Sequence, residues 1–412
     1  MKKAGIESVL VLSPEPPYPL NGGGAFRIAS LIHYFARFAD VDLILFSESG
    51  QPAIVPPGLL RSQTVIPLPQ HSRGTVARYI RNARRAIQGT PPLIDRLAGH
   101  NEEIARVISG KHYDFGIVEH LWAAQYLKEI ASACAHTVLD LHNIESILHR
   151  RCAETTHGLI AAGQERFAHA AHEIEKNLLP QYSMVLTTSR EDAALATQIA
   201  PTAKISVYPN ALPETPAPQV REQPVIVFSG NFKYHPNIDA VDFLMSSIWP
   251  EVHRQCPELR LRLVGRGDKL IRHLLPSGFR VEVTGAVENA LKEIAAARIV
   301  IAPLRTGSGT RIKILEAWAG ARPVIATSLA AEGLQCLGDR DVIIANGGKD
   351  FGSAIARLNA DPSRRVSLSV NGRRLFEENY TWQAAWKTLD ATLAHGTGTA
   401  HRYTEDSDAN SR

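Results

Sequence analysis

The chain has 412 residues, of which 44% are hydrophobic and 21% are charged. This balance is typical of a globular protein with two domains of roughly 150–200 residues each. The formal net charge of +4 is too small to indicate a nucleic-acid partner, and no run approaches the ~20 apolar residues of a membrane span.

The first residues and the cysteines indicate a cellular compartment. Residues 1–13 have a basic start, but the apolar run is short and a glutamate interrupts it, so we interpret the run as a buried strand and not a signal peptide. None of the four cysteines forms a C-x-x-C pair, and the histidines show no metal-binding spacing. We therefore expect reduced thiols, no metal and a cytoplasmic protein.

Strands and helices alternate along the first half of the chain. Residues 8–13 form a continuous apolar run, typical of a parallel strand covered on both faces. A helix is predicted over 26–38, one long helix over 145–178, and another after Ser189, which is a good N-cap. The other strands expected here are 41–47, 115–120, 137–143 and 184–189.

A proline-rich segment, 206–218, ends this alternation and is the best linker candidate. A second βα series then follows, with strands expected at 224–230, 259–265, 280–285, 298–304, 323–327 and 341–345. Repeated strand–helix–strand units form parallel, doubly wound sheets. The sequence therefore predicts an α/β fold of two facing Rossmann-like domains, 1–205 and 219–375, with ligands in the cleft at the carboxyl ends of the strands.

The most informative motif is G-S-G-T-R-I-K-I-L-E-A-W-A-G-A-R-P-V-I-A-T, from Gly307 to Thr327. A glycine-flanked loop opens it, and we expect a helix carrying Arg311, Lys313 and Glu316 to follow. Unpaired N–H groups at a helix start favour an anion, and a carboxylate can accept hydrogen bonds from sugar hydroxyls. The motif thus suits a nucleoside diphosphate. Lys313 and Glu316 share a helix face, which is also typical of a solvated ion pair.

Further glycine-rich loops follow other predicted strands. Gly22 to Gly24, with Arg27, follow the first strand but do not form G-x-G-x-x-G, so a nicotinamide fingerprint is absent. In the second half, S-G-N-F-K-Y-H-P (229–236), V-G-R-G (264–267) and T-G-A-V (284–287) end successive strands. Each loop alone is a weak signal, and a flexible turn is the alternative interpretation.

Polar residues also end two strands of the first half. His142 lies in V-L-D-L-H-N-I-E-S, at the carboxyl end of an apolar strand, where site residues gather in open α/β sheets. Asn143 is alternatively a helix N-cap, and Glu145 or Asn143 could orient His142. Glu119 and His120 end the preceding strand and would face the same cleft, unless they are surface polar residues.

In their order and motifs these elements resemble the retaining glycosyltransferases of the GT-B fold, the GT4-type or group 1 family. The resemblance covers nearly the whole chain. In that family a Glu-x7-Glu motif binds the donor; its second glutamate corresponds to Glu316, whereas Ser308 stands at the first. The resemblance also implies that a final helix, 376–395, with Trp382 and Trp386, crosses back to the first domain. Residues 396–412 are expected to be a disordered tail.

The resemblance implies roles for particular residues. Glu316 would hold the ribose, Lys233 with the N–H groups of Gly309 and Thr310 would hold the phosphates, and His142 would hydrogen-bond the donor sugar. We therefore expect His142, Lys233 and Glu316 to carry the reaction. The expected donor-binding residues are Gly23, Gly24, Gly230, Lys233, Gly265, Arg266, Val287, Ser308, Gly309, Thr310, Arg311, Lys313 and Glu316. The expected acceptor residues are Glu119, His120, Asn143 and Glu145.

The activity that the resemblance implies is transfer of a sugar from a nucleotide sugar to a hydroxyl acceptor with retention, without metal or cofactor, in the synthesis of a polysaccharide or glycoconjugate. Two alternatives remain: an epimerase or hydrolase of the same fold, or a binding protein whose transfer activity has decayed, as Ser308 suggests. The arginine-rich segment 72–89 contains no acidic residue and is predicted to contact an anionic membrane, or else to be a solvated helix face.

Overall fold

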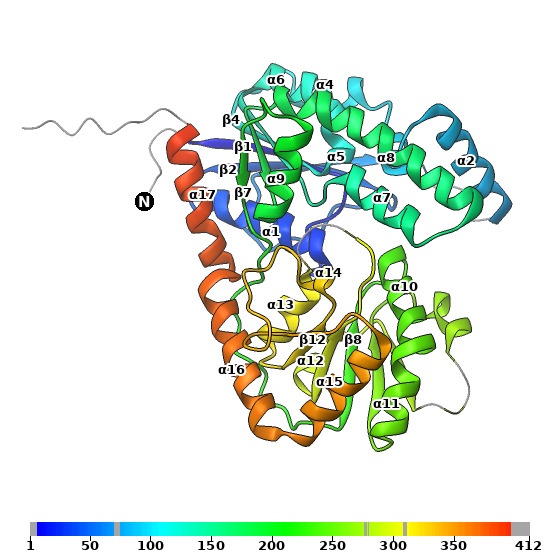
Figure 1. Cartoon of the computed structure of the whole chain (residues 1–412). Coiled ribbons are helices and arrows are strands. Elements are labelled where there is room, and N and C mark those ends of the chain that lie inside the picture. The colour runs from blue at the N-terminus through cyan, green and yellow to red at the C-terminus, as the bar shows by residue number, and fades with distance from the viewer. Residues whose placement is uncertain (1–5, 70–74, 276–277, 279, 308–310, 397–412) are drawn as a thin grey trace, which may run out of the picture.

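The computed structural model describes residues 6–69, 75–275, 278, 280–307 and 311–396. Their elements form two α/β units, one above the other in Figure 1, with α17 running along the upper unit. The first unit contains β1 (Ser8–Ser13), α1 (Gly23–Ala36), β2 (Asp40–Ser47), β3 (Ser62–Pro67), α2 (Thr75–Gln88), α3 (Pro92–Arg96), α4 (Asn101–Ile108), β4 (Tyr113–Glu119), α5 (His120–Ala123), α6 (Leu127–Ala133), β5 (Cys134–Asp140), α7 (Glu145–Glu154), α8 (Gly158–Leu178), β6 (Met184–Thr187), α9 (Arg190–Ile199) and β7 (Ile205–Val207).

The second unit follows after the proline-rich segment. It contains β8 (Val225–Ser229), α10 (His235–Phe243), α11 (Trp249–Gln255), β9 (Arg260–Val264), β10 (Val281–Gly285), α12 (Ala290–Ala295), β11 (Ile299–Ala302), α13 (Ile312–Ala319), β12 (Val324–Ala326), α14 (Ser328–Ala331), β13 (Ile343–Ile344), α15 (Gly348–Ala360), α16 (Pro362–Asn379) and α17 (Trp382–Gly396).

Each unit is built on one parallel sheet. The first has seven strands in the order β3-β2-β1-β4-β5-β6-β7, and the second has six in the order β10-β9-β8-β11-β12-β13. The chain reverses its winding direction between β1 and β4 in the first sheet and between β8 and β11 in the second. Ligands bind at the carboxyl ends of strands at such switch points, so the two switch points define where a site is expected. The predicted α/β fold with two doubly wound sheets is confirmed.

Buried strands hold each sheet between layers of helices. The side chains of β8 are buried along its whole length, which explains the uninterrupted apolar run in its sequence. On one face of the first sheet, Val9 and Val11 share a core with Trp382 and Leu389 of α17. The chain therefore returns to the first unit at its end. We keep 1–205, 219–375 and 376–395 as proposed domain limits.

Several sequence predictions are wrong in detail. The single helix expected over 145–178 is two helices, α7 and α8, and the second begins at Gly158, whose φ is +60°. The N-cap of α7 is Ile144 and not Asn143, which was the residue considered for this position. The first turn of α7 is bonded instead by the carboxylate of Glu175, which accepts hydrogen bonds from the backbone N–H (3.2 Å) and the hydroxyl of Ser146. Strand β3 was missed, and β7 takes part of the segment interpreted as linker. None of the helices within the described ranges is long and apolar enough to cross a membrane.

Candidate active site

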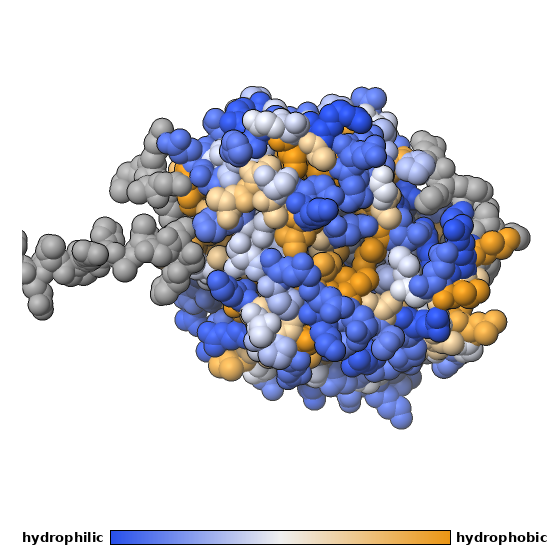
Figure 2. Space-filling model, turned by 90° about the horizontal axis from the view of Figure 1, so that it is seen from above, coloured by the Kyte–Doolittle hydropathy of each residue, from blue (hydrophilic) through white to orange (hydrophobic). Residues whose placement is uncertain are grey.

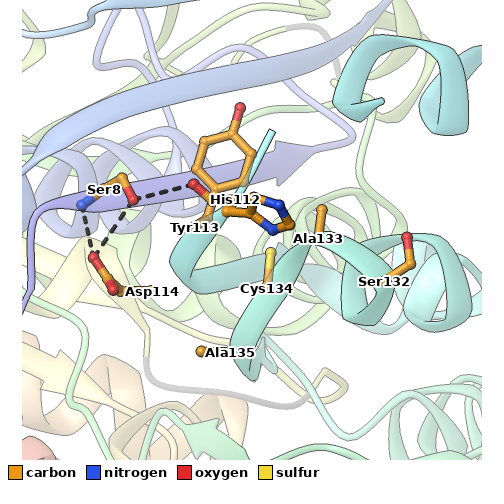
Figure 3. Close-up of a pocket in the computed structure, with 8 residues that line it drawn as sticks. All are labelled: Ser8, His112, Tyr113, Asp114, Ser132, Ala133, Cys134 and Ala135. Carbon is orange, nitrogen blue, oxygen red and sulfur yellow. Dashed lines mark hydrogen bonds between the residues drawn. The ribbon is translucent and has the colours of Figure 1, made fainter. Parts of the chain in front are cut away.

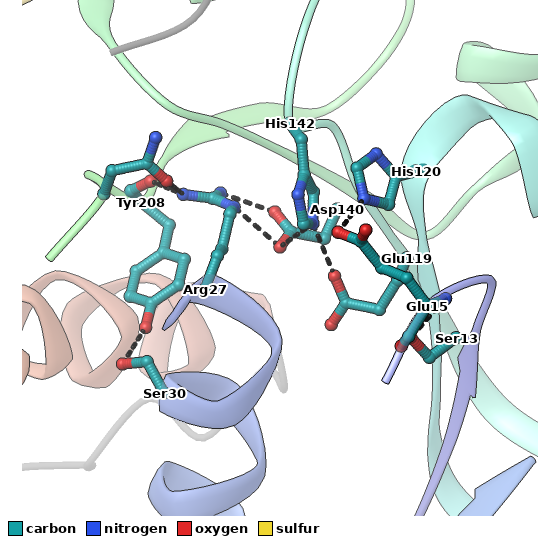
Figure 4. Close-up of polar contacts among 10 residues, drawn as sticks. Ser13, Glu15, Arg27, Ser30, Glu119, His120, Asp140, His142 and Tyr208 are labelled. Carbon is teal, nitrogen blue, oxygen red and sulfur yellow. Dashed lines mark hydrogen bonds and ion pairs between the residues drawn. The ribbon is translucent and has the colours of Figure 1, made fainter. Parts of the chain in front are cut away.

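Two neighbouring strands of the first sheet, β4 and β5, end in carboxylic acids that lie side by side. Glu119 and Asp140 are register partners on these strands, and neither exposes any surface to solvent. His142, two residues beyond β5, turns back over them, and its Nε2 lies 2.8 Å from Glu119 Oε2 and 3.6 Å from Asp140 Oδ2. Figure 4 shows this cluster at the carboxyl ends of the strands. The switch point thus carries two buried acids and one imidazole.

Arg27 of α1 lies inside this cluster. Its guanidinium donates two hydrogen bonds to Asp140, one from Nε at 2.7 Å and one from Nη2. Its Nη1 donates to the Tyr208 carbonyl oxygen (2.7 Å) and to Asn210 (3.0 Å). The sequence motif grouped Arg27 with the glycine loop that faces a ligand, but the side chain is only 2% exposed. Arg27 therefore neutralises a buried carboxylate and does not line the cleft.

Burial shifts the pKa of Glu119 and the pKa of His142 in opposite directions. Desolvation, followed by the nearby Asp140 charge, raises the pKa of Glu119 well above its usual range. Desolvation, together with His120 and Arg27, lowers the pKa of His142 well below its usual range. Burial therefore favours the neutral form of both Glu119 and His142.

His120 adds a second imidazole to the cluster. Its ring lies 3.5 Å, centroid to centroid, from that of His142 and stacks on Trp122 at 4.0 Å. Its φ of +64° is unusual for a residue with a side chain. Its Nε2 lies 3.3 Å from Glu15 Oε1, and that oxygen occupies the space that a side chain at Gly24 would need. Gly24 therefore lets the loop after β1 reach this cluster.

Two sets of three groups here lie close enough together to hold a metal ion: Glu15, His120 and His142, and Glu119, Asp140 and His142, with ligand atoms within 4.8 Å. The close contacts inside the sets, however, are acid-to-imidazole bonds, and the Arg27 guanidinium places a positive charge beside Asp140. We therefore interpret the cluster as a hydrogen-bond network. The expectation that no metal is needed stays a prediction.

The second sheet places Glu316 at its own switch point. Glu316 lies on α13, and Ser229, the last residue of β8, donates to its carboxylate at 3.5 Å. Burial raises the pKa of Glu316 to about 7. Lys313, one turn earlier, donates to Asn237 Oδ1 at 2.7 Å and lies 5.0 Å above the Phe228 ring, and burial lowers its pKa to about 7. Both side chains are half-buried, and the alternative of a solvated Lys–Glu pair stays open.

The glycine loops of the second sheet pack on one another. Gly265 has a φ of +141°, and a side chain there would overlap the Gly230 carbonyl oxygen. Lys233 and Arg266 are exposed on the two loops that meet here, and the Phe232 N–H donates to the Arg266 carbonyl oxygen at 2.9 Å. Two cations thus stand at the open edge of this switch point. Val287 is half-buried after β10 and packs against the core of the second unit.

Contacts between the two units bring both switch points together. A side chain at Gly23, where α1 begins, would lie 3.2 Å from Ile312, where α13 begins. Arg151 of α7 donates to the Gly307 carbonyl oxygen at 2.8 Å and forms a bidentate ion pair with Glu332 at 2.6 and 2.8 Å. The starts of α1 and α13 therefore face each other across the contact.

Most of the predicted site residues lie at the switch points of the two sheets. Glu119, His120, His142, Gly23 and Gly24 lie at the first switch point. Glu119 reaches the cleft only through His142, because it is fully buried.

Not all residues of the motif at 307–327 lie where the sequence predicts. Arg311 precedes α13 instead of lying on it, with φ −85° and ψ 99°, and is 8% exposed, so the expectation of a helix carrying Arg311 is wrong. Ser308, Gly309 and Thr310 lie outside the described residues.

Asn143 and Glu145 lie beside the first switch point. Glu145 is buried, and desolvation and the nearby Glu175 raise its pKa to about 8, whereas the Trp122 and Asn143 side chains favour its charged form. No role was predicted from the sequence for Glu15, Asp140 or Trp122. The signal for Asp140 was present, since a single acid at the end of an otherwise apolar strand indicates a buried, paired carboxylate.

A separate hollow lies at the opposite edge of the first sheet. Figure 3 shows this pocket of about 390 Å³, lined by Ser8, His112, Tyr113, Asp114, Ser132, Ala133, Cys134 and Ala135. These residues stand at or near the amino ends of β1, β4 and β5, where Asp114 accepts hydrogen bonds from the Glu7 and Ser8 N–H groups at 2.7 and 3.0 Å. The pocket is therefore not part of the candidate site.

Comparison with solved structures defines the class of fold. The chain is similar to a sucrose-phosphate synthase from Thermosynechococcus elongatus, with a TM-score of 0.72 at 16% identity, covering 94% of this chain and 98% of the other. It is also similar to TarM (TM-score 0.67, 10% identity, 95% and 99% covered) and to Anabaena HepE in complex with UDP and glucose (TM-score 0.65, 14% identity, 94% and 100% covered). The fold is therefore GT-B, as expected.

Sequence comparison identifies the family. Residues 223–361 match the family model described as glycosyl transferases group 1, which confirms the predicted resemblance. A 44.6 kDa protein of the cps region of Klebsiella pneumoniae is 18% identical over 404 residues, covering 92% of this chain and 98% of that protein. The family supports a glycosyl-transferring enzyme.

Proposed function

We propose that this chain is a retaining glycosyltransferase that moves a sugar from a UDP-sugar to a hydroxyl group of an acceptor. One observation carries the proposal: Gly23 approaches Ile312 so closely that an added side chain would meet it, and this brings together the carboxyl-end switch points of two parallel sheets. One switch point holds a buried acid–imidazole cluster and the other holds Glu316. The similar HepE structures hold UDP and glucose or UDP-glucose, which supports UDP as the nucleotide.

The proposed reaction forms a bond between the acceptor oxygen and the anomeric carbon on the face from which the diphosphate leaves. The departing phosphate oxygen takes the acceptor proton, so no protein base is required. The chain's part is to place both substrates and to stabilise the charge that develops on the phosphate. No metal or cofactor is required in this scheme.

Residues of the second domain would bind the nucleotide. Glu316 accepts hydrogen bonds from the ribose hydroxyls, and Lys233, exposed beside the Gly230 loop, pairs with the diphosphate. Lys313 is a second cation one turn from Glu316, and a bound diphosphate would favour its protonated form, since burial alone lowers its pKa. His142 of the first domain hydrogen-bonds the transferred sugar, while His120 and Trp122 border the acceptor.

The acceptor is proposed to be a glycan, a lipid-linked sugar or a small molecule, used in cell-surface polysaccharide or glycoconjugate synthesis in the cytoplasm. The similar protein of the cps region supports a polysaccharide pathway. Ser308, in place of the first glutamate of the family motif, is the feature that favours a second candidate function, nucleotide-sugar binding without transfer. Tight UDP binding with no turnover on any acceptor would decide for the second candidate.

UDP is expected to stabilise the protein against heat, and the Glu316→Ala variant is expected to bind it more weakly by roughly 1–3 kcal/mol, the loss of charge-assisted hydrogen bonds. At 100 times its Kd, UDP should add about 2.7 kcal/mol of stability. Calorimetry of both proteins measures the difference. Glu288→Ala, which removes an exposed acid of the same domain, is the control and should bind UDP normally. Equal UDP affinity in Glu316→Ala would remove Glu316 from the site.

A membrane-facing patch is a further part of this proposal. Ile80 and Ile87 of α2 are exposed, and so are Leu159 and Ile160 of α8. The two helices are joined by Arg166 of α8, which donates to the carbonyl oxygens of Ala86 and Ile87. Figure 2 shows hydrophobic residues among hydrophilic ones on the right-hand edge, where these helices lie. Apolar side chains among arginines fit an anionic lipid surface.

The patch is expected to make the protein float with vesicles that contain anionic lipid, and less with neutral vesicles. Ile87→Ser with Leu159→Ser should reduce flotation severalfold. The matched control is Val366→Ser with Val370→Ser, since both valines are equally exposed on α16, 62% and 60%. Equal flotation of the two double variants would refute the patch.

A further inference from the structure

The two acids at the ends of β4 and β5, Glu119 and Asp140, are not both charged, because the site does not offset the free-energy cost of burying two carboxylates. Glu119 and Asp140 are adjacent in register and fully buried. The guanidinium of Arg27 gives both of its carboxylate bonds to Asp140 and none to Glu119 among the described residues. A second buried carboxylate without a cation of its own is strongly disfavoured. One of the two acids therefore retains a proton.

The hydrogen bonds indicate which acid retains it. Both Asp140 oxygens accept from Arg27, whereas Glu119 Oε1 is buried and has no hydrogen-bond partner among the described residues. Ionised Glu119 would leave this oxygen charged and unsolvated. Its other oxygen, Oε2, lies 2.8 Å from His142 Nε2, a distance normal for a hydrogen bond. The imidazole is thus an acceptor at bonding distance for the proton on Glu119. Asp140 also lies within hydrogen-bond reach of Glu119, but both of its oxygens already accept from Arg27.

We infer that Glu119 is a neutral carboxylic acid that donates a hydrogen bond to His142 Nε2 and thereby fixes His142 as the Nδ1–H tautomer. A neutral imidazole that accepts at one nitrogen carries its proton on the other. His142 is thus a hydrogen-bond donor through Nδ1 and not a base. Glu119 is a positioning residue, which acts on the substrate only through His142.

The inference deepens the proposed function, on which its catalytic consequence rests. In a displacement where the leaving phosphate takes the acceptor proton, a basic imidazole beside the sugar has no task. A donor is useful there, because it binds a sugar hydroxyl oxygen and holds the ring in place. Asp140 and Arg27 complete the network: the ion pair keeps the negative charge on Asp140, which in turn holds the proton on Glu119.

Nitrogen-15 NMR of the histidine-labelled full-length protein tests the tautomer directly. We expect His142 to be protonated at Nδ1 in the wild type and in Glu119→Gln, whose amide N–H replaces the acid as donor to Nε2. In Glu119→Ala the ring should move to the Nε2–H tautomer. A wild-type His142 protonated at Nε2 would overturn the inference, whatever the enzyme does to sugars.

Kinetics then test the role. Glu119→Ala should lower kcat about 10- to 100-fold with unchanged UDP affinity, and Glu119→Gln should restore most of it. The matched control is Glu103→Ala, which removes the acid from a similar pair, His100 Nδ1 to Glu103 Oε2 at 2.6 Å, away from the site. It should change neither kcat nor the His142 signals. A folded Glu119→Gln that binds UDP but has lost turnover would contradict the positioning role, whereas UDP binding without turnover in the wild type would contradict only the proposed function.

Discussion

Replacing Arg27 with methionine is expected to lower the free energy of unfolding by about 3–5 kcal/mol, the typical cost of removing one partner of a buried ion pair. The variant leaves Asp140 charged at zero exposure and takes a donor from the Tyr208 carbonyl oxygen. Methionine fills much of the same volume, so the loss reports on charge and hydrogen bonds. Urea denaturation followed by tryptophan fluorescence measures the change.

Two comparisons make this experiment decisive. Arg272→Met removes an exposed arginine that is bonded to Asp268 on the surface, and it should leave the unfolding curve nearly unchanged. Arg27→Met combined with Asp140→Asn removes both charges and should recover part of the lost stability. If Arg27→Met were as stable as the wild type, the cluster would not depend on a buried ion pair.

Replacing Gly265 with alanine is expected to destabilise the second domain by roughly 3 kcal/mol or more, since residues with a side chain rarely adopt its backbone conformation. The new methyl group would also overlap the Gly230 carbonyl oxygen. That oxygen is backbone and cannot move without shifting β8 or β9. The loop beside Lys233 would be displaced as well, so UDP affinity should fall with stability. Thermal unfolding and calorimetry measure the two effects.

Gly163→Ala is the matched control for this variant. Gly163 lies inside α8, and a side chain there would meet open space. Alanine should therefore stabilise the helix by about 0.5–1 kcal/mol. A Gly265→Ala protein with wild-type stability would show that the two loops separate easily.

Much of the fold could be predicted because its signals are local. The apolar runs of β1, β8 and β11 mark strands covered on both faces, and alternation with helices leads to parallel sheets. Strand β3 gave no such signal, since S-Q-T-V-I-P at the sheet edge is mostly half-buried and polar. The break between α7 and α8 was missed because alanine and charged residues continue the helical pattern past Gly158.

The candidate site was predictable only in part, for a physical reason. Glu119 ends β4, His142 follows β5 and Glu316 lies on α13, all elements that the sequence indicates, and the carboxyl ends of strands gather at one edge of a sheet. Which buried charges pair with each other could not be predicted. Arg27 and Asp140 are separated by 113 positions in the sequence, and they come into contact only because α1 packs on the sheet. Periodicity predicts which face of an element is buried, but it does not show which buried charges pair.

The bond of Arg151 to both Glu332 and the Gly307 carbonyl oxygen has a consequence for turnover. Arg151 of the first domain thus bonds two residues of the second domain, and one of them, Gly307, directly precedes the loop that is proposed to bind the phosphates. Any motion that separates the two units must therefore break the bonds of Arg151 to Gly307 and Glu332. We therefore expect release of the proposed nucleotide to be coupled, through Arg151, to separation of the two units.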